Sequence, residues 1–410
     1  MLFQLVLFLL IAFLTWLLWS YYKERKYRKK PFYAMSEIGW RTQAAPPLSE
    51  RIHSIALVGD IGNAGAPDQD PVLKTLDHWL QEVCSIDSTA VFLGDNIYPV
   101  GLPPQGHRHH GTAVQKLTHQ LELLAKYKTR AIYLGGNHDW NKGRKDGHSY
   151  MQRQQEFITM FLQDQEAYLP KNGCLGPVTR EINEQLLLVV INSQWWVQRG
   201  FRPLGEKYGC DLEVPSNFFV KLEEILAANR HRMVVIAGHH PLYTNALHGG
   251  KFTVKQRLFP LTFVHKRAMI PLPVFGTLYQ LYRKYVGAAE DMSYPPFRRF
   301  RKKILKVLHQ YPGLFYVAGH DHNLQYFQVK GSHFAVSGSG SKTNFVAKGG
   351  RAFFNHENKG FMVLDQYQNG EVWLRVLEPG AEGEAPVLMY HKRIYQPTPR
   401  PHLGEAAAVL

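Results

Sequence analysis

The segment AVFLGDNIY, residues 90–98, is a short apolar run that ends in two side chains able to bind a metal ion, Asp95 and Tyr98. An apolar run of this length that ends in glycine and a polar residue predicts a strand whose sheet has a site beyond the strand ends. Four further runs share the pattern: ALVGD (56–60), AIYLGGNHD (131–139), MVVIAGHH (233–240) and FYVAGHDH (315–322). A sixth run, LLLVVINSQ (186–194), ends in Asn192 and Ser193, which are poorer metal ligands.

The ends of these runs supply oxygen and imidazole donors, and their number predicts two metal ions rather than one. Two ions about 3.5–4 Å apart need a shared anion, because their mutual repulsion is otherwise uncompensated. Asp95 is the candidate bridge, since each of its two oxygens can take one ion. The other ligands divide into a set for each metal: Asp60, Tyr98 and His322 for the first, and Asn137, His239 and His320 for the second.

Each of these side chains has a simpler interpretation when taken alone. An aspartate after a strand, such as Asp60, is usually a turn residue or helix cap, and an asparagine after glycine, such as Asn137, is usually a turn residue. A single histidine is more often a surface side chain than a ligand. However, the motifs GD, GDNxY, GNHD, GHH and GHDH follow one another at successive strand ends, and this order favours a metal site.

Strand-like runs alternate with helical patterns over most of the chain. Strands are expected near residues 53–59, 89–94, 130–135, 186–192, 232–237 and 314–318, with helices at 71–83, 113–127, 151–163 and 217–230. This alternation predicts an α/β layered fold with a largely parallel central sheet. The later runs HFAVSGS (333–339), GFMVLDQY (360–367) and EVWLRVLE (371–378) have no helix between them, so we expect a second, antiparallel set of strands.

The composition is that of a globular protein with a sizeable core: of 410 residues, 45% are hydrophobic and 20% are charged. The net charge of +15 lies in residues 23–30 and 251–303, which together account for the whole excess. The three cysteines, Cys84, Cys174 and Cys210, cannot all pair, and no CxxC motif is present. Free thiols are the default expectation and a Cys174–Cys210 disulfide is the alternative, so cysteine usage leaves the compartment open.

The first nineteen residues, Met1 to Trp19, contain no charged side chain and are long enough to span a bilayer core of about 30 Å. Aromatic residues end this run and a basic cluster follows at once, whereas a cleavable signal would have a basic start and a small-residue cleavage site. We therefore expect a transmembrane anchor (1–22), a basic juxtamembrane tether (23–51), a catalytic domain (52–395) and a tail (396–410). The positive-inside rule predicts that the domain faces the cytoplasm, with export as the alternative.

Residues 250–312 interrupt the alternation with aromatic and leucine side chains among lysines and arginines, as in TLYQLYRKY (277–285) and FRRFRKKILKVLHQY (297–311). The second segment predicts an amphipathic basic helix. This insertion is either a solvated helical region or a surface that lies on anionic lipid, where each Lys or Arg contributes about 1 kcal/mol. Nucleic acid is the least favoured partner and is not expected, because attraction to phosphates is unselective.

With these motifs the chain resembles the calcineurin-like metallophosphoesterases over residues 53–365, less the insertion. GDNIY (94–98), GNHD (136–139), GHHPLYTNALHGG (238–250) and GHDHNLQY (319–326) are most similar to the small, tartrate-resistant purple acid phosphatases. The resemblance implies a four-layer α/β/β/α sandwich of two mixed sheets, with a dinuclear site at the C-terminal rim of the strands. It places the metal ligands at the seven positions proposed from spacing, and it implies hydrolysis of phosphate monoesters by a metal-activated hydroxide.

Four side chains that do not bind the metals are also expected to have roles, and for His138 and His248 the resemblance implies them. His138 stabilises the phosphoryl group or donates a proton, and His248, in LHGG, protonates the leaving group unless it is a loop histidine without a role. Asp139 orients His138 or a ligand histidine through a hydrogen bond, and His240 supports the neighbouring ligand.

One departure from the wider superfamily concerns the first strand, where most members carry Asp-x-His. Here Ile61 and Gly62 follow Asp60, and the pattern of the purple subgroup implies that the Tyr98 phenolate replaces the missing imidazole. A phenolate is a hard anionic oxygen, so the first site favours Fe(III), while the second suits Zn(II), Fe(II) or Mn(II). Fe(III) conflicts with a reducing cytoplasm, and relatives of this type are mostly exported.

Two other functions are alternatives to monoester hydrolysis. A phosphodiesterase or lipid pyrophosphatase on the same scaffold would suit a membrane face, given the anchor and the basic insertion, but Tyr98 argues against it. A non-enzymatic protein that binds membrane or nucleic acid through its basic patches conflicts with the completeness of the ligand set.

Overall fold

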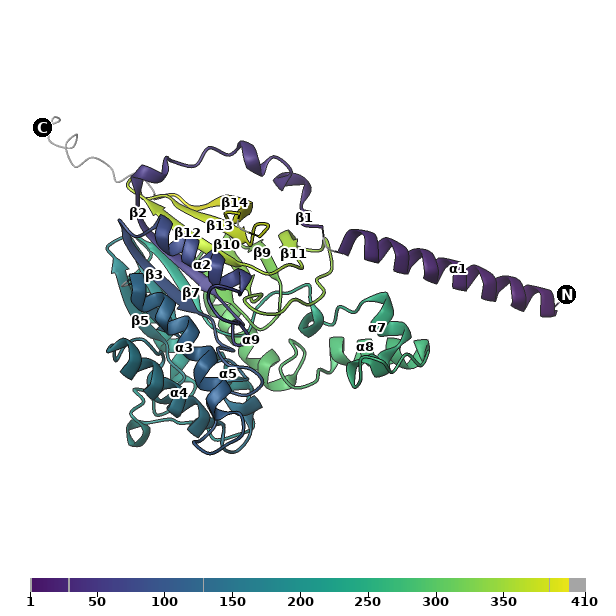
Figure 1. The fold of residues 1–410 in the computed structure, drawn as a ribbon, viewed down its shortest axis with the longest axis horizontal. Coiled ribbons are helices and arrows are strands. Elements are labelled where there is room, and N and C mark those ends of the chain that lie inside the picture. Colours follow the sequence, from purple (N-terminus) through teal and green to yellow (C-terminus); the bar gives the residue numbers. More distant parts are fainter. Residues whose placement is uncertain (1, 29, 128, 383, 398–410) are drawn as a thin grey trace, which may run out of the picture.

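Two mixed β-sheets lie face to face in the computed structural model, which describes residues 2–28, 30–127, 129–382 and 384–397 (Figure 1). The strands of the six-stranded sheet, in spatial order, are β14 (Val387–Tyr395), β13 (Val372–Glu378), β12 (Phe361–Tyr367), β2 (Arg51–Val58), β3 (Asp87–Phe92) and β4 (Arg130–Tyr133). The strands of the eight-stranded sheet are β1 (Phe32–Tyr33), β11 (Ala352–His356), β9 (Leu324–Val329), β10 (Ser332–Ser337), β8 (Phe315–Ala318), β7 (Met233–Ala237), β6 (Leu186–Val190) and β5 (Val178–Asn183).

The alternation of side chains along β2 explains the layered packing. Ile55 and Leu57 belong to the core between the two sheets, whereas Ala56 and Val58 belong to the core under the helices. The helices that cover the six-stranded sheet are α2 (Pro71–Glu82), α3 (His110–Tyr127) and α4 (Gly147–Leu162), and those that cover the eight-stranded sheet include α6 (Asn217–Ala228) and α9 (Pro295–Leu308). This is the four-layer α/β/β/α sandwich that the resemblance implied.

The six predicted strands correspond to β2, β3, β4, β6, β7 and β8, and the four predicted helices to α2, α3, α4 and α6. The parallel strands do not form one central sheet, however, because β2, β3 and β4 lie in one sheet and β6, β7 and β8 in the other. The expectation of a single central sheet is therefore wrong. The expectation failed because a strand buried on both faces has the same apolar sequence pattern whichever of the two sheets it belongs to.

The N-terminal segment begins with α1 (Leu2–Arg28), an exposed helix that is long and apolar enough to cross a membrane. It projects away from the sheets in Figure 1 and is the one candidate span within the described residues. Part of the predicted tether, residues 23–51, contacts the domain. β1 pairs with β11, Trp40 is buried, and Glu37 accepts a hydrogen bond from the Tyr390 hydroxyl at 2.6 Å.

The predicted insertion divides into two parts with different surroundings. α9 is amphipathic, as predicted, but its apolar side chains Phe297, Phe300 and Ile304 pack into the domain core, so this face is not free to lie on lipid. Residues 251–292, which contain α7 (Val254–Leu258) and α8 (Pro273–Tyr285), instead project from the body near α1 (Figure 1). We call residues 251–292 the hairpin.

The cysteines also differ from the default expectation. Cys174 and Cys210 form a disulfide with Cα atoms 5.5 Å apart, while Cys84 is free and exposed. The two partners are 36 residues apart, on either side of β5, β6 and α5 (Ser193–Val197), so only the folded chain brings them together. The predicted tail, residues 396–410, lies outside the described residues from 398 onward.

Candidate metal centre

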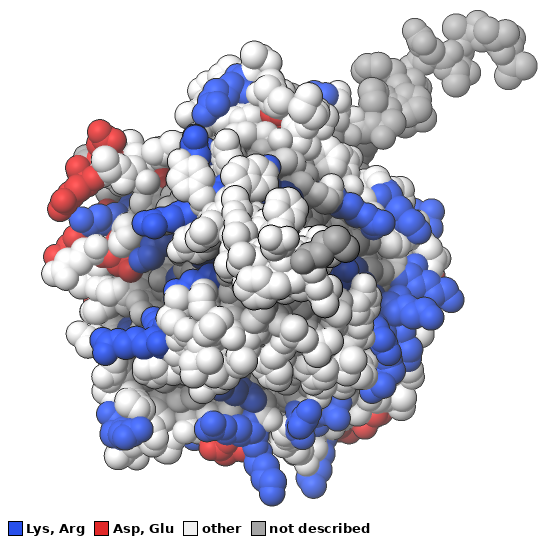
Figure 2. Space-filling model, turned by 90° about the vertical axis from the view of Figure 1, so that its right-hand side faces the viewer, with Lys and Arg blue, Asp and Glu red and all other residues white. Residues whose placement is uncertain are grey.

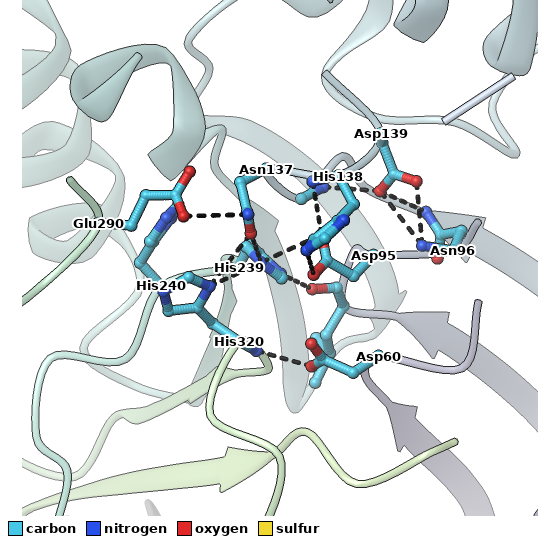
Figure 3. Close-up of polar contacts among 12 residues, drawn as sticks. Asp60, Asp95, Asn96, Asn137, His138, Asp139, His239, His240, Glu290 and His320 are labelled. Carbon is cyan, nitrogen blue, oxygen red and sulfur yellow. Dashed lines mark hydrogen bonds and ion pairs between the residues drawn. The ribbon is translucent and has the colours of Figure 1, made fainter. Parts of the chain in front are cut away.

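The C-terminal ends of strands from both sheets meet at one place, where the polar residues that follow them face one another (Figure 3). Asp60, Asp95 and His320 each adopt a left-handed backbone conformation just after their strands, with φ of 60°, 55° and 69°. Such backbone is strained in residues other than glycine and tends to occur at functional sites. Close approach also requires glycine, because a Cβ on Gly136 would clash with Asp95 Oδ1 and one on Gly319 with Asp60 Oδ2.

The first group of side chains surrounds the Tyr98 hydroxyl. Its oxygen lies 2.9 Å from Asp60 Oδ1, 3.0 Å from Asp95 Oδ2 and 3.0 Å from His322 Nε2. His322 Nε2 is itself 3.4 Å from Asp60 Oδ1. The single hydroxyl proton can satisfy one of these acceptors, so four electron-rich atoms converge where a cation would satisfy all of them.

The second group consists of Asn137, His239 and His320, which follow β4, β7 and β8. Asn137 Oδ1 lies 3.0 Å from His239 Nε2 and 3.2 Å from His320 Nδ1, and these two nitrogens are 3.2 Å apart. His239 Nδ1 donates to the carbonyl of Leu93 at 2.8 Å, which leaves a lone pair on Nε2. Lone pairs again face one another with too few protons between them, and a divalent cation fits this donor set.

Asp95 lies between the two groups and turns one oxygen toward each. Oδ2 faces Tyr98, while Oδ1 lies 3.5 Å from His239 Nε2 and accepts a hydrogen bond from the His138 backbone N–H at 2.9 Å. Ligand atoms of Asp60, Asp95 and His239 all lie within 4.8 Å of one another. Asp95 thus has the position that a carboxylate shared by two metals requires.

The charge state of the buried groups is unusual without a cation. Burial, followed by the charge of Asp95, raises the pKa of Asp60 to about 8. Burial also acts to raise the pKa of Asp95, but His138 and His239 outweigh it and the pKa falls to about 2. The pKa of Tyr98 is raised well above its usual value by burial and by the two carboxylates. A high positive charge at this point would stabilise all three groups as anions.

The two histidines predicted to act on the substrate border the two groups. The His138 ring centre lies 4.5 Å from that of Tyr98, and its Nδ1 donates to the carbonyl of Pro99 at 2.5 Å, so Nε2 faces Asp95 Oδ2 at 3.8 Å. The His248 ring centre lies 4.1 Å from that of His320. Both rings are therefore placed beside the expected metal positions.

Asp139 is buried at the site but does not orient a histidine, so that prediction is wrong. Its carboxylate accepts hydrogen bonds from the backbone N–H groups of Asn96 at 3.0 Å and Gly136 at 2.8 Å, and from the Asn96 side chain at 3.2 Å (Figure 3). Buried main-chain amides need an acceptor, and here the carboxylate supplies it. Asp139 thereby ties the turn that carries Asp95 to the turn that carries Asn137.

His240 supports the second group through Ser193. The Ser193 hydroxyl oxygen accepts from the backbone N–H groups of His239 at 3.1 Å and His240 at 3.0 Å, and it lies 2.9 Å from His240 Nδ1. The apolar run that ends in Ser193 supplies the poorest metal ligands of the six runs. Ser193 instead fixes the backbone of the loop that carries His239 and His240. Ligand atoms of His239, His240 and His320 also lie within 4.8 Å of one another.

Two acidic residues that sequence reasoning missed come from the end of the hairpin. Glu290 Oε2 accepts a hydrogen bond from Asn137 Nδ2 at 3.1 Å, and burial raises the pKa of Glu290 to about 7. Asp291 Oδ1 lies 3.1 Å from His248 Nδ1, and Asp291 Oδ2 accepts from Arg283 Nε at 2.7 Å. A signal was present, because these two are the only acids in the strongly basic stretch 251–303.

Lys342 is a third residue that sequence reasoning missed. Its Nζ lies 3.1 Å from the centre of the Tyr98 ring, and burial lowers its pKa. It follows the glycine- and serine-rich segment 337–341, in which nothing indicates a site residue. The lysine adds a positive charge beside the first group.

Comparison with known proteins gives a family match and distant structural neighbours. The sequence profile of the calcineurin-like phosphoesterase family matches residues 53–324, and no curated protein matches at a significant level. Among solved structures, GAP50, the anchor in the inner membrane complex of Plasmodium, is 13% identical with a TM-score of 0.46, over 84% of this chain and 88% of that one. The purple acid phosphatase PPD1 from yellow lupin (Lupinus luteus) seeds is 14% identical with a TM-score of 0.49, over 85% and 54%. PhoD is 9% identical with a TM-score of 0.46, over 84% and 72%.

Proposed function

The chain belongs to the calcineurin-like phosphoesterase family, and from this we propose that it hydrolyses phosphate monoesters at a dinuclear metal site of the purple acid phosphatase type. The observation that carries the proposal is the Tyr98 hydroxyl, which lies within 3.0 Å of Asp60, Asp95 and His322. A phenol among buried carboxylates and an imidazole supports a site for a trivalent ion, and the purple subgroup is the one whose motifs this chain resembles.

The metals would be held by the seven side chains of the two groups: Asp60, Tyr98 and His322 for one ion, Asn137, His239 and His320 for the other, and Asp95 for both. A bound metal pair supplies an activated water near neutral pH and neutralises charge on the phosphoryl oxygens. The donor chemistry favours Fe(III) at the first position and Fe(II), Zn(II) or Mn(II) at the second. Iron-loaded protein without a visible absorption band would contradict the Fe(III) assignment.

The other polar side chains at the site act on the substrate. His138 presents Nε2 to the site because its Nδ1 is held by Pro99, and a protonated His138 would donate to a phosphoryl oxygen. His248 is held by Asp291 through Nδ1, which leaves Nε2 to protonate the leaving oxygen. The Lys342 ammonium group favours the doubly charged monoester over a singly charged diester.

A comparison of two substrates tests this function. We expect kcat/KM for p-nitrophenyl phosphate to exceed that for bis(p-nitrophenyl) phosphate by at least about 100-fold, since Lys342 favours the substrate with the higher negative charge. Chelation of the metals should remove the activity, and added metal should restore it. A preference for the diester would overturn the monoester proposal in favour of a phosphodiesterase on the same scaffold.

We further propose that α1 is a membrane anchor and that the catalytic domain lies in an oxidising compartment. The Cys174–Cys210 disulfide supports this side, because such bonds persist where thiols are not kept reduced. By the positive-inside rule, the basic residues at the end of α1 predict a cytoplasmic domain. That prediction depends on one short segment, whereas the disulfide belongs to the folded domain itself.

Alkylation of free thiols in acid-quenched cells, followed by mass measurement of the protein, tests this location. We expect one modified thiol, on Cys84, and two more only after reduction. Three modified thiols without reduction would place the domain in a reducing compartment.

A further inference from the structure

We propose that the hairpin, residues 251–292, is embedded in the lipid bilayer beside α1, and that the site it borders takes the phosphate monoester of a membrane lipid. The second half of this statement rests on the proposed phosphomonoesterase function. The first half does not.

The hairpin exposes apolar side chains that nothing in the described chain covers. Val264 at its tip is 87% exposed and Val274 on α8 is 73% exposed. On α8, Val274, Leu278, Leu281 and Tyr285 follow the three- and four-residue spacing of one helix face. The opposite face contains two buried residues: Gly276, which lies against the Arg257 carbonyl of α7, and Arg283, which is paired with Asp291. A continuous apolar stripe on the outer face of a helix marks an interaction surface rather than a solvated one.

The position of the hairpin along α1 is the reason to infer that lipid covers this stripe. Three α1 residues, Phe13, Trp16 and Leu17, line a pocket that they share with five hairpin residues: Val254, Arg257, Leu258, Pro273 and Thr277. The Val254 backbone N–H also donates to Glu24 at 2.8 Å, which fixes α7 against the helix. At about 1.5 Å of rise per residue, Phe13 and Leu17 lie about 8–14 Å from Tyr22, the aromatic end of the apolar run. If α1 crosses a bilayer, the hairpin is therefore level with its hydrocarbon part.

The charges around the stripe also fit a bilayer. The hairpin contains seven basic residues, whereas its two acids, Glu290 and Asp291, are turned into the active site. Figure 2 shows the side of the molecule from which α1 projects: its centre is uncharged, and lysine and arginine side chains surround that centre. A centre without charged side chains, surrounded by basic ones, suits acyl chains surrounded by anionic headgroups.

The base of the hairpin is part of the active site. His248 precedes the hairpin and Asp291 lies near its end, yet His248 Nδ1 and Asp291 Oδ1 are 3.1 Å apart, and the Met292 backbone N–H donates to the His248 carbonyl at 3.0 Å. Glu290 contacts the ligand Asn137 at the same place. The hairpin therefore begins next to the active site, extends to the proposed level of the acyl chains and ends next to the active site again. A lipid phosphate can place its headgroup in the site while its chains stay beside the hairpin.

The position of the hairpin can be measured on the full chain reconstituted into vesicles that contain an anionic phospholipid. A nitroxide attached at Leu278→Cys, in a Cys84→Ser background, is expected to be accessible to oxygen and shielded from a water-soluble nickel complex. The matched control is the same label at Val220→Cys on α6, an exposed apolar position away from the hairpin, which should show the reverse. A water-accessible label at position 278 would overturn membrane insertion and leave a partner protein as the occupant of the stripe.

The substrate class is tested with dioleoyl phosphatidic acid in the vesicles and with glycerol 3-phosphate in solution. We expect the wild-type protein to prefer the lipid, and the triple variant Val274→Ser, Phe275→Ser and Leu278→Ser to lose at least tenfold of its rate on the lipid while its rate on glycerol 3-phosphate is unchanged. The control triple variant, Met160→Ser, Val214→Ser and Val220→Ser, should keep both rates. Equal loss on both substrates, or no preference for the lipid, would overturn the substrate assignment. Inactivity of the wild type on both phosphates would instead overturn the proposed function, while the label still reports on insertion.

Discussion

Replacement of Asp95 by asparagine is expected to lower kcat/KM for p-nitrophenyl phosphate by about 1,000-fold or more. Asp95 has one oxygen facing a ligand side chain of each group, Oδ2 toward Tyr98 and Oδ1 toward His239. The substitution keeps the size of the side chain and an oxygen that can accept from the His138 backbone N–H. It removes the charge that two cations would share, and it replaces one of the two ligand oxygens by an NH2 group. The rate measurement should be made at saturating metal, so that weak binding is not the cause of the loss.

The stability of the same variant separates loss of the site from loss of the fold. Without metal, Asp95→Asn should melt at a lower temperature than the wild type, because His138 and His239 lower the pKa of Asp95 to about 2 and its charge therefore stabilises the folded state at neutral pH. With metal, the wild type should gain stability and the variant should gain little, since a ligand stabilises the folded state in proportion to its affinity. Wild-type activity together with wild-type metal stabilisation in Asp95→Asn would refute the role of this residue.

The parts of the site that follow strands were predictable from the sequence. A strand buried on both faces is a continuous apolar run in the sequence, and its last residue lies at the edge of the sheet. The motifs GD, GNHD and GHDH follow such runs, so their positions at the edge of a sheet could be predicted. Asp60, Asn137 and His320 therefore lie where their motifs indicated. The sequence did not reveal that these strands belong to two sheets, because the burial pattern is the same in each.

The parts that depend on contacts between distant segments were not predictable in the same way. Asp139 follows a ligand-rich motif, yet its partners are buried main-chain amides of another turn, which no side-chain pattern reveals. Glu290 reaches Asn137 across 153 positions of sequence, from a segment whose composition indicated only a basic surface. Trp40 lies in a stretch without periodicity and is nevertheless buried in the core. In each case tertiary packing, and not local propensity, determines the environment.

Substitution of a ligand that belongs to only one of the two groups should remove the metal ion of that group and leave the other ion bound. His322→Ala removes a side chain of the first group only, and His320→Ala removes one of the second group only, so each variant is expected to bind about one metal per chain fewer than the wild type. Tyr98→Phe should abolish the violet charge-transfer band of iron-loaded protein, because no phenolate remains to bind Fe(III). The exposed His78 on α2 provides a matched control, and His78→Ala should match the wild type in metal content and colour.

All of these expectations depend on the binding of two metal ions by the seven ligand side chains. Elemental analysis of the purified full-length protein, with the chain concentration determined independently, measures this number directly. We expect two metal ions per chain in the wild type, with iron as one of them, and one ion fewer in His322→Ala and in His320→Ala. A wild-type protein that is fully active with one ion or none, or variants that keep both ions, would contradict this expectation.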